Sequence, residues 1–140
     1  MTGPTGGTRL TIGRGFLLIA ALALANVSRN YGVDPERTLH ELFGFTITSK
    51  AEVHMFRAVM GLYLAFAGYW IAGALRPSWT RPAMVSVVLL MGGLAGGRVL
   101  SIVVDGTPNS TLTSYLVVEV VFAVVGGALL WWTRPVTPAP

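Results

Sequence analysis

The sequence predicts an all-α membrane protein, an antiparallel bundle of four transmembrane helices that forms one domain over residues 1–140. Composition is the first reason, because 53% of the residues are hydrophobic and only 11% are charged, against roughly 25% charged residues in ordinary soluble domains. The mean hydropathy of +0.64 agrees with it. Order along the chain is the second reason, because four apolar segments follow one another, each near the roughly 20 residues that a membrane-spanning helix needs.

The four predicted membrane helices cover residues 10–27, 53–75, 82–104 and 112–133. The first is the shortest, and Arg14 near its start lies where a long side chain reaches the lipid headgroups. This segment has an alternative interpretation, because Arg14, the apolar run after it and the Ala23-Leu24-Ala25 triplet satisfy the pattern of a cleaved secretory signal. We expect a retained first helix, with the signal peptide as the alternative.

The connections between the predicted helices are polar. A long loop covers residues 28–52, a tight turn with the sequence RPSWTRP covers residues 76–82, and a DGTPNS loop covers residues 105–110. Prolines mark both tails of the chain, which we expect to be unstructured. Tryptophans stand in the tight turn and at the end of the last helix, as expected of an aromatic belt on one side of the membrane.

Basic residues in the connections predict the orientation in the membrane. One side would hold Arg9, Arg14, Arg76, Arg81 and Arg134. The other side would hold Arg29, Arg37 and Lys50, which neighbouring acidic residues dilute. Because Lys and Arg accumulate on the cytoplasmic side, we expect both termini in the cytoplasm and the first and third connections outside.

The composition excludes several kinds of site. The chain has no cysteine, which excludes disulfides and thiolate metal ligands, and its two histidines are too few for an all-histidine metal site. No cofactor motif is present, so we predict neither a metal nor a cofactor. A pI near 10.1 could suggest nucleic acid, yet the basic residues are spread singly along the chain and form no patch. We therefore predict no nucleic-acid partner.

Three charged residues lie well inside the predicted membrane helices, namely Arg57, Arg98 and Glu119. A charge in hydrocarbon costs roughly 2.5 to 3.5 kcal/mol on insertion scales, so residues of this kind point to function. At a rise of about 1.5 Å per residue, all three lie roughly 6 to 10 Å below the outer surface. We expect them to lie within reach of one another.

Further polar residues are expected in the same layer. They are Asn26, His54, Ser101, Tyr115 and Asp105. Small residues repeat at helical spacing on the same helices, as in Gly61, Ala65 and Gly68, and such residues allow helices to approach closely in lipid. The pairs Gly92-Gly93 and Gly96-Gly97 repeat in the same way. These patterns predict packing faces that direct the charges into the bundle, around a polar pocket that opens outward.

Three stretches resemble a known family: HMFRAVMGLYLAFAGYW at residues 54–70, GGRVLSIVVDGTP at residues 96–108 and SRNYGVDP at residues 28–35. They are similar to small bacterial four-helix membrane proteins catalogued as a domain of unknown function. In that family H-x-x-R-A-x-x-G-x-Y and G-R-x-x-S-x-x-x-D-G-x-P blocks recur, with a Glu in the last helix. The resemblance implies the four-helix fold, these polar positions and a bacterial inner membrane, and it implies no particular reaction.

The residues favour a membrane-embedded enzyme or lipid-binding protein that acts on an amphipathic molecule. The expected ligand-binding residues are Arg57, Arg98, Ser101, Tyr115, Asp105 and Asn26. The two arginines would hold a carboxylate, a phosphate or a developing oxyanion, and their excess over one carboxylate favours an anionic ligand. Glu119 would be the general acid or base of an isomerisation or cyclisation, and His54 would exchange protons with the outside.

Three alternatives remain open. A salt bridge between an arginine and Glu119 could simply fix the register of the helices. An accessory subunit, docked on another membrane protein or on a second copy of the chain, fits the small size and the glycine-rich faces. A small proton-coupled transporter would use Glu119 to exchange a cation, and the arginines at the same level argue against it.

Overall fold

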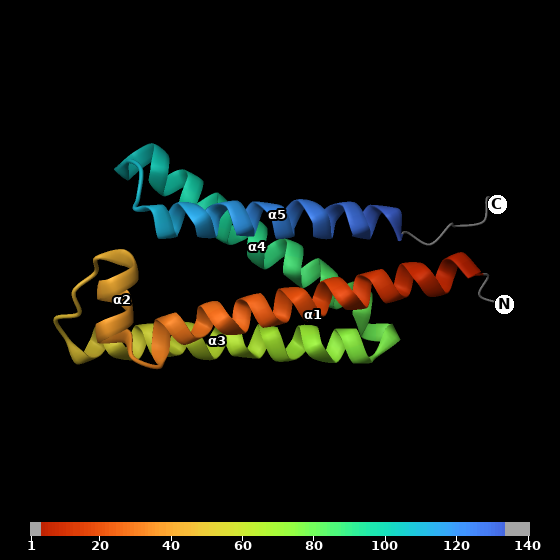
Figure 1. Cartoon of the computed structure of the whole chain (residues 1–140), viewed down its shortest axis with the longest axis horizontal. Helices are drawn as coiled ribbons and strands as arrows, with labels where there is room; N and C mark the ends of the chain where they lie inside the picture. The colour runs from red at the N-terminus through yellow and green to blue at the C-terminus, as the bar shows by residue number, and fades with distance from the viewer. Residues whose placement is uncertain (1–3, 134–140) are drawn as a thin grey trace.

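The structure is a computed structural model that describes residues 4–133, with side chains described from residue 7 onward. It contains five helices, drawn in Figure 1: α1 (Pro4–Gly32), α2 (Pro35–Phe43), α3 (Lys50–Leu75), α4 (Pro77–Asp105) and α5 (Ser110–Trp132). All except α2 are long and apolar enough to cross a membrane, and they run antiparallel. The predicted all-α fold with four membrane helices is confirmed over the described residues.

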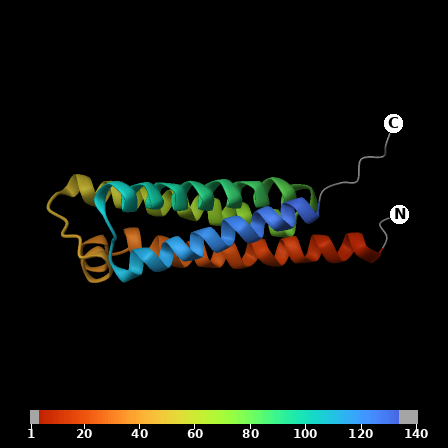
Figure 2. The same ribbon diagram turned by 90° about the horizontal axis from the view of Figure 1, so that it is seen from above.

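The four long helices pack as two pairs. α1 lies along α3, and α4 packs against α5 at an oblique angle, as Figures 1 and 2 show. The pairs meet mainly where α4 packs on α3 and α1, and the core there consists of Leu17, Ala20, Trp70, Ala83 and Val87, all with 0% exposure. Within this core Trp70 Nε1 donates a hydrogen bond of 2.9 Å to Ser86 Oγ and so joins α3 to α4.

Several helices are longer than predicted. α1 extends from Pro4 to Gly32, although the prediction covered residues 10–27 and treated the start of the chain as an unstructured tail. The prediction followed apolar residues, whereas a helix satisfies its backbone hydrogen bonds internally and continues through polar residues until a cap ends it. The same holds at the start of α3. Its N-cap is Ser49, which forms a capping box with Glu52, so the helix begins before the predicted start at residue 53. The tail predicted after Arg134 lies outside the described residues.

The tight turn predicted over residues 76–82 is wrong, because Arg76 alone separates α3 from α4. Pro77 takes the first position of α4, where the missing N–H of proline costs nothing. The two helices approach closely at this end, since a Cβ added to Gly73 would collide with Ala83. Thr80 Oγ1 donates a 2.8 Å hydrogen bond to the carbonyl of Gly73 and ties the ends of the two helices together.

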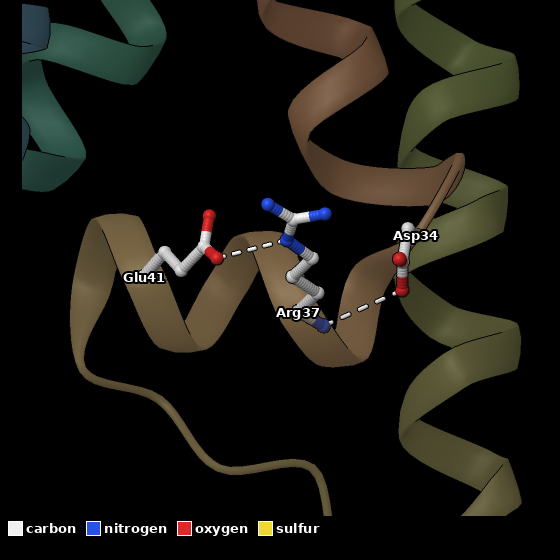
Figure 3. A network of polar contacts seen from close by, with 3 residues as sticks. All are labelled: Asp34, Arg37 and Glu41. Carbon is white, nitrogen blue, oxygen red and sulfur yellow. Dashed lines mark hydrogen bonds and ion pairs between the residues drawn. The ribbon is translucent and has the colours of Figure 1, made fainter.

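The loop predicted over residues 28–52 contains a helix, α2, that the prediction missed. Its N-cap is Asp34, whose side chain accepts a hydrogen bond of 3.4 Å from the backbone N–H of Arg37 (Figure 3). Pro35 occupies the first position of α2, and Gly44 ends it in the left-handed conformation with a φ of 70°. Arg37 also pairs with Glu41 one turn later at 2.8 Å on the exposed face. The sequence DPERTLHELFG therefore carries a start and a stop signal for a short helix.

α2 lies across one end of the bundle (Figure 1). Leu39 anchors it with an exposure of 1%. Phe43 packs against Tyr31 of α1 at 5.7 Å and against Tyr115 of α5 at 5.9 Å between ring centroids. Asn109, the N-cap of α5, donates a 3.1 Å hydrogen bond to the carbonyl of Leu42. This end of the bundle is consequently bridged by side chains from both helix pairs.

Two adjacent glycines of α5 provide a test of the packing. A Cβ at Gly126 would lie 2.9 Å from Val88 Cγ2 and 3.1 Å from Phe16 Cζ, whereas a Cβ at Gly127 meets no atom within 4 Å. Both changes to alanine gain the same helix propensity, about 1 kcal/mol. Because of overpacking, we expect the free energy of unfolding of Gly126→Ala to be about 1 to 3 kcal/mol lower than that of Gly127→Ala. The measurement is thermal unfolding in a neutral detergent. Equal stability of the two variants would contradict this packing of α5.

Candidate functional site

The ion pair between Arg98 and Glu119 is the centre of the candidate site. Arg98 Nε lies 2.8 Å from Glu119 Oε2 and 3.0 Å from Glu119 Oε1. The side chain of Arg98 is 20% exposed and that of Glu119 is 8% exposed. The pair joins α4 to α5, and the similar positions of these two residues along their helices bring them together.

Tyrosines from three helices gather around this ion pair. The guanidinium carbon of Arg98 lies 5.7 Å from the ring centroid of Tyr115, one turn before Glu119 on α5. Tyr31 of α1 interacts with the Arg98 side chain, and Tyr63 of α3 meets the ring of Tyr31 edge-on at 5.8 Å. A guanidinium is attracted to the face of an aromatic ring. The charge that α4 contributes is therefore enclosed by aromatic side chains from α1, α3 and α5.

The prediction chose the wrong asparagine of α1. Asn30 Nδ2 donates a hydrogen bond of 3.0 Å to the hydroxyl of Tyr115, whereas Asn26 is exposed. Because the predicted helix ended at residue 27, Asn30 and Tyr31 were placed in a loop. One signal was available, since Tyr31 follows the buried Leu24 at a spacing of seven residues and so continues the inward face of the helix.

Two small cavities border Arg98. The first has a volume of about 40 Å³ and is lined by residues of all four membrane helices: Ala23, Leu24, Val27, Tyr63, Met91, Leu94, Arg98, Tyr115, Val118, Glu119 and Phe122. The second, of about 70 Å³, is lined by Arg98, Ser101, Ile102, Pro108, Leu112 and Leu116. One water needs roughly 10 to 15 Å³ of such space, so the first cavity is of the size that holds water molecules.

Arg57 does not pair with Glu119, which corrects the expected cluster of three charges. Its side chain is exposed, and its Nε donates a hydrogen bond of 3.4 Å to the carbonyl of Gly32. That carbonyl belongs to the last residue of α1, where the helix dipole favours a cation. Arg57 therefore ties α3 to the end of α1, and the buried layer contains one arginine for one carboxylate. The excess of arginine that favoured an anionic ligand is absent from this layer of the described structure.

The remaining predicted residues lie at the same end of the bundle. His54 is exposed near the start of α3 and does not line the cavity beside the ion pair. Ser101 lines the second cavity with Arg98, and its hydroxyl donates a hydrogen bond of 2.9 Å to Asp105 Oδ2 one turn along α4. Within the described chain, no three His, Asp or Glu side chains come together as ligands of a metal ion would.

The glycine-rich faces point away from the bundle, so their predicted packing role within the chain is wrong. A Cβ would meet nothing within 4 Å at Gly61, Gly68, Gly92, Gly93, Gly96 or Gly97. The close approaches use other glycines, such as Gly73 and Gly126. The spacing identified the helix faces that consist of small residues, but it did not reveal whether another helix of the chain packs against them. α4 consequently presents an exposed stripe of glycine backbone to its surroundings.

Comparison with known proteins identifies a family. A family model described as Domain of unknown function (DUF4345) matches residues 12–133, which span all four membrane helices and contain both Arg98 and Glu119. No curated protein and no solved structure matches the chain. The resemblance seen in the sequence to a family of unknown function is confirmed.

A double-mutant cycle tests the ion pair. Breaking a buried pair leaves an uncompensated charge, so we expect Glu119→Leu or Arg98→Met alone to lower the free energy of unfolding by about 3 kcal/mol. The double variant should recover much of that loss, because both charges are then gone. The measurement is unfolding of the detergent-solubilised chain by titration with dodecyl sulfate.

The exposed pair of Arg37 and Glu41 is the matched control, with side-chain exposures of 72% and 56%. We expect the cycle of Arg37→Met and Glu41→Leu to show little coupling, because solvent screens such pairs. Coupling of equal size in both cycles would mean that burial does not set the strength of the Arg98–Glu119 pair.

Proposed function

The chain belongs to this family of unknown function, and we propose that it is a small integral membrane protein that binds an amphipathic molecule by its anionic headgroup at Arg98. One observation carries the proposal: the buried Arg98–Glu119 pair borders a cavity that all four membrane helices line. Ionisable residues inside a membrane bundle are costly to keep and typically mark a binding or proton-transfer site.

The geometry of the ion pair supports binding by exchange. Glu119 is bonded to Nε of Arg98, so an incoming anion meets the terminal N–H groups of the guanidinium, beside Tyr31 and Tyr115. A guanidinium can hold a carboxylate or phosphate through two parallel hydrogen bonds. The headgroup of the ligand would then replace Glu119 as the partner of Arg98.

The packing of the helices supports a route for the ligand. A cavity of about 40 Å³ is too small for a headgroup, so it must widen on binding. α5 contacts α1 slightly and, within the described residues, makes no appreciable contact with α3. A small displacement of α5 away from α1 would therefore widen the cavity while α4 keeps its packing on α3 and α1.

Displacement of Glu119 from Arg98 would cause its carboxylate to take up a proton. An unpaired carboxylate among side chains such as Val118 and Phe122 is expensive to keep ionised, and a proton removes that cost. The neutral Glu119 would then be a positioned acid next to the bound molecule. Acid-base catalysis of an isomerisation or cyclisation is the catalytic form of this proposal. His54, exposed at the same end of the bundle, would exchange that proton with water.

The proposed setting is the inner membrane of a bacterium with both termini in the cytoplasm. The support is the distribution of basic residues, since Arg9, Arg14, Arg76 and Arg81 lie at one end of the long helices. The site at Arg98 then opens to the outer half of the bilayer. A cation exchanger would need a free carboxylate, and the pairing of Glu119 with Arg98 disfavours that function.

Binding of a long-chain alkanesulfonate tests the exchange, because this probe stays ionised between about pH 5 and 8. If Glu119 takes up one proton as the probe binds, binding is favoured at low pH, and the affinity falls by up to about tenfold for each unit of rise in pH. The measurement is isothermal titration of the purified chain in a neutral detergent at several pH values.

Two variants and a control make the result specific. Glu119→Gln should bind the sulfonate with no such pH dependence, and Arg98→Gln should lose binding. Arg57→Gln should behave like the wild type, because Arg57 is exposed and bonded to the backbone of α1. Wild-type binding that is independent of pH, or that survives in Arg98→Gln, would sink the proposal.

The exposed glycines of α4 support a second function, assembly with another membrane helix. Gly92 and Gly96, and likewise Gly93 and Gly97, stand one turn apart with open space beside them. Two helices in lipid approach most closely through such small residues, and no hydrophobic force is needed. The partner would be another membrane protein or a second copy of this chain, and this function requires no chemistry at Arg98.

Assembly is tested by adding bulk to the glycine stripe. We expect the double variant Gly92→Leu with Gly96→Leu to reduce the size of the particle extracted in mild detergent, measured by light scattering after gel filtration. Val124→Leu is the control, since Val124 is 65% exposed and belongs to another helix, α5. Assembly with a second copy would be excluded if the wild-type chain is monomeric and both variants form particles of the same size as the wild type.

A further inference from the structure

A further cavity lies at the end of the bundle opposite the Arg98 site. It has a volume of about 370 Å³ and is lined by Arg9, Leu10, Gly13, Pro77, Thr80, Arg81, Met84 and Thr133. These residues come from the start of α1, the start of α4 and the residue after α5, which meet at the end of the bundle where α1 begins (Figure 1). The volume falls within the roughly 300 to 1,000 Å³ of ordinary ligand sites.

Two arginines give this cavity its charge. The guanidinium carbon of Arg9 stacks 5.1 Å from the ring centroid of Trp132, and Arg81 Nη1 donates a hydrogen bond of 3.3 Å to the carbonyl of Leu130. Each contact holds a guanidinium in place while using only part of its five N–H donors. The cavity is therefore bordered by two positioned cationic groups.

No acidic side chain neutralises these arginines. The six acidic residues of the chain are Asp34, Glu36, Glu41, Glu52, Asp105 and Glu119. All of them lie in α2 and its cap, at the start of α3, at the end of α4 or beside Arg98, and none lines this cavity. The charge of Arg9 and Arg81 is therefore open to an anion from outside the chain.

The rest of the lining is apolar in character. Leu10, Gly13 and Met84 form one part of the wall, and both threonine hydroxyls are already bonded to backbone carbonyls, Thr80 to Gly73 at 2.8 Å and Thr133 to Leu129 at 2.7 Å. Recognition of a polar ligand is left to the arginines. A molecule that fills this cavity needs an anionic group joined to an apolar body.

The exposed tryptophans indicate the depth of the cavity in the membrane. Trp79, Trp131 and Trp132 are 42%, 68% and 42% exposed at this end of the bundle. Tryptophan prefers the level of the lipid headgroups, so the two arginines lie where headgroup phosphates are concentrated. The tryptophans thus favour a position of the cavity at the level of the headgroup phosphates of one leaflet.

We propose that this cavity binds an anionic phospholipid, with its phosphate between Arg9 and Arg81 and the first carbons of its acyl chains against Leu10 and Met84. An inorganic phosphate would use the two arginines alone and would gain nothing from the apolar wall, which is why the lipid is the favoured source of the anion. The site lies at the other end of the bundle from Arg98, so it is independent of the function proposed above.

Lipid binding to the delipidated full-length chain in a neutral detergent tests the proposal. The probes are phosphatidylglycerol, phosphatidylcholine with the same acyl chains, and inorganic phosphate, and binding is read by native mass spectrometry and by quenching of tryptophan fluorescence. We expect phosphatidylglycerol to bind more tightly than phosphatidylcholine. Each of Arg9→Gln and Arg81→Gln should weaken its binding about fivefold, as expected for one basic residue at a membrane surface.

Control variants separate this site from general attraction to positive charge. Arg37→Gln and Arg57→Gln remove exposed arginines at the opposite end of the bundle and should leave the binding of phosphatidylglycerol unchanged. Leu10→Trp fills the cavity while keeping both arginines, and we expect it to weaken phosphatidylglycerol binding as well. This variant also decides the matter if the arginine variants fail to fold, which their thermal unfolding shows.

Three results would overturn the proposal. Equal affinity for phosphatidylglycerol and phosphatidylcholine would show that the cavity does not select an anionic headgroup. Displacement of phosphatidylglycerol by an equal concentration of inorganic phosphate would assign the site to a free anion. Unchanged binding in Leu10→Trp would place the lipid outside the cavity.

Discussion

A bilayer offers no hydrogen-bonding partners in its hydrocarbon layer, and most of this structure depends on that constraint. Each long segment satisfies its backbone as a helix, and polar side chains inside the bundle bond to the next helix, as Trp70 does with Ser86 and Thr80 with Gly73. Among the described residues, no buried side-chain nitrogen or oxygen lacks a partner. The Arg98–Glu119 pair is the most demanding case, because an unpaired charge costs far more than an unpaired hydroxyl. Removal of either partner would therefore leave an uncompensated charge inside the bundle, whether or not the pair takes part in binding.

Counting residues along the helices did not reveal which way the three charged side chains face. Residue counting placed Arg57, Arg98 and Glu119 in one layer, but depth does not say which way a side chain faces around its helix axis. Arg57 donates a hydrogen bond to the carbonyl of Gly32 instead. The prediction could not place this carbonyl at a helix end, because it ended the first helix at residue 27 and α1 ends at Gly32. The same distinction explains the glycine faces. Spacing shows that a helix face consists of small residues, but it does not show what packs against that face. α2 was missed for another reason, because a search for apolar segments does not read short capping signals such as Asp34 and Gly44.

Among the described residues, arginines pair with carboxylates at one end of the bundle only. Near α2 these pairs are Arg98–Glu119 and Arg37–Glu41, while Arg57 at the same end bonds to the carbonyl of Gly32. At the opposite end they meet the carbonyl ends of helices, with Arg14 bonded to Ala74 and Arg81 to Leu130. A helix C-terminus carries only about half a negative charge, so it cannot neutralise a guanidinium fully. That end stays electropositive, which suits both its expected cytoplasmic position and contact with anionic lipids.

Glu119 is the one charged residue buried within α5, whose other core contacts are apolar, as with Phe122 and Leu129. α5 leaves the ribosome after α4, so Arg98 enters the membrane while no carboxylate is yet beside it. Insertion of α5 ends that state, and the unsatisfied guanidinium favours its arrival. A chain that stops before Ser110 would therefore keep the guanidinium of Arg98 without its carboxylate partner inside the bilayer.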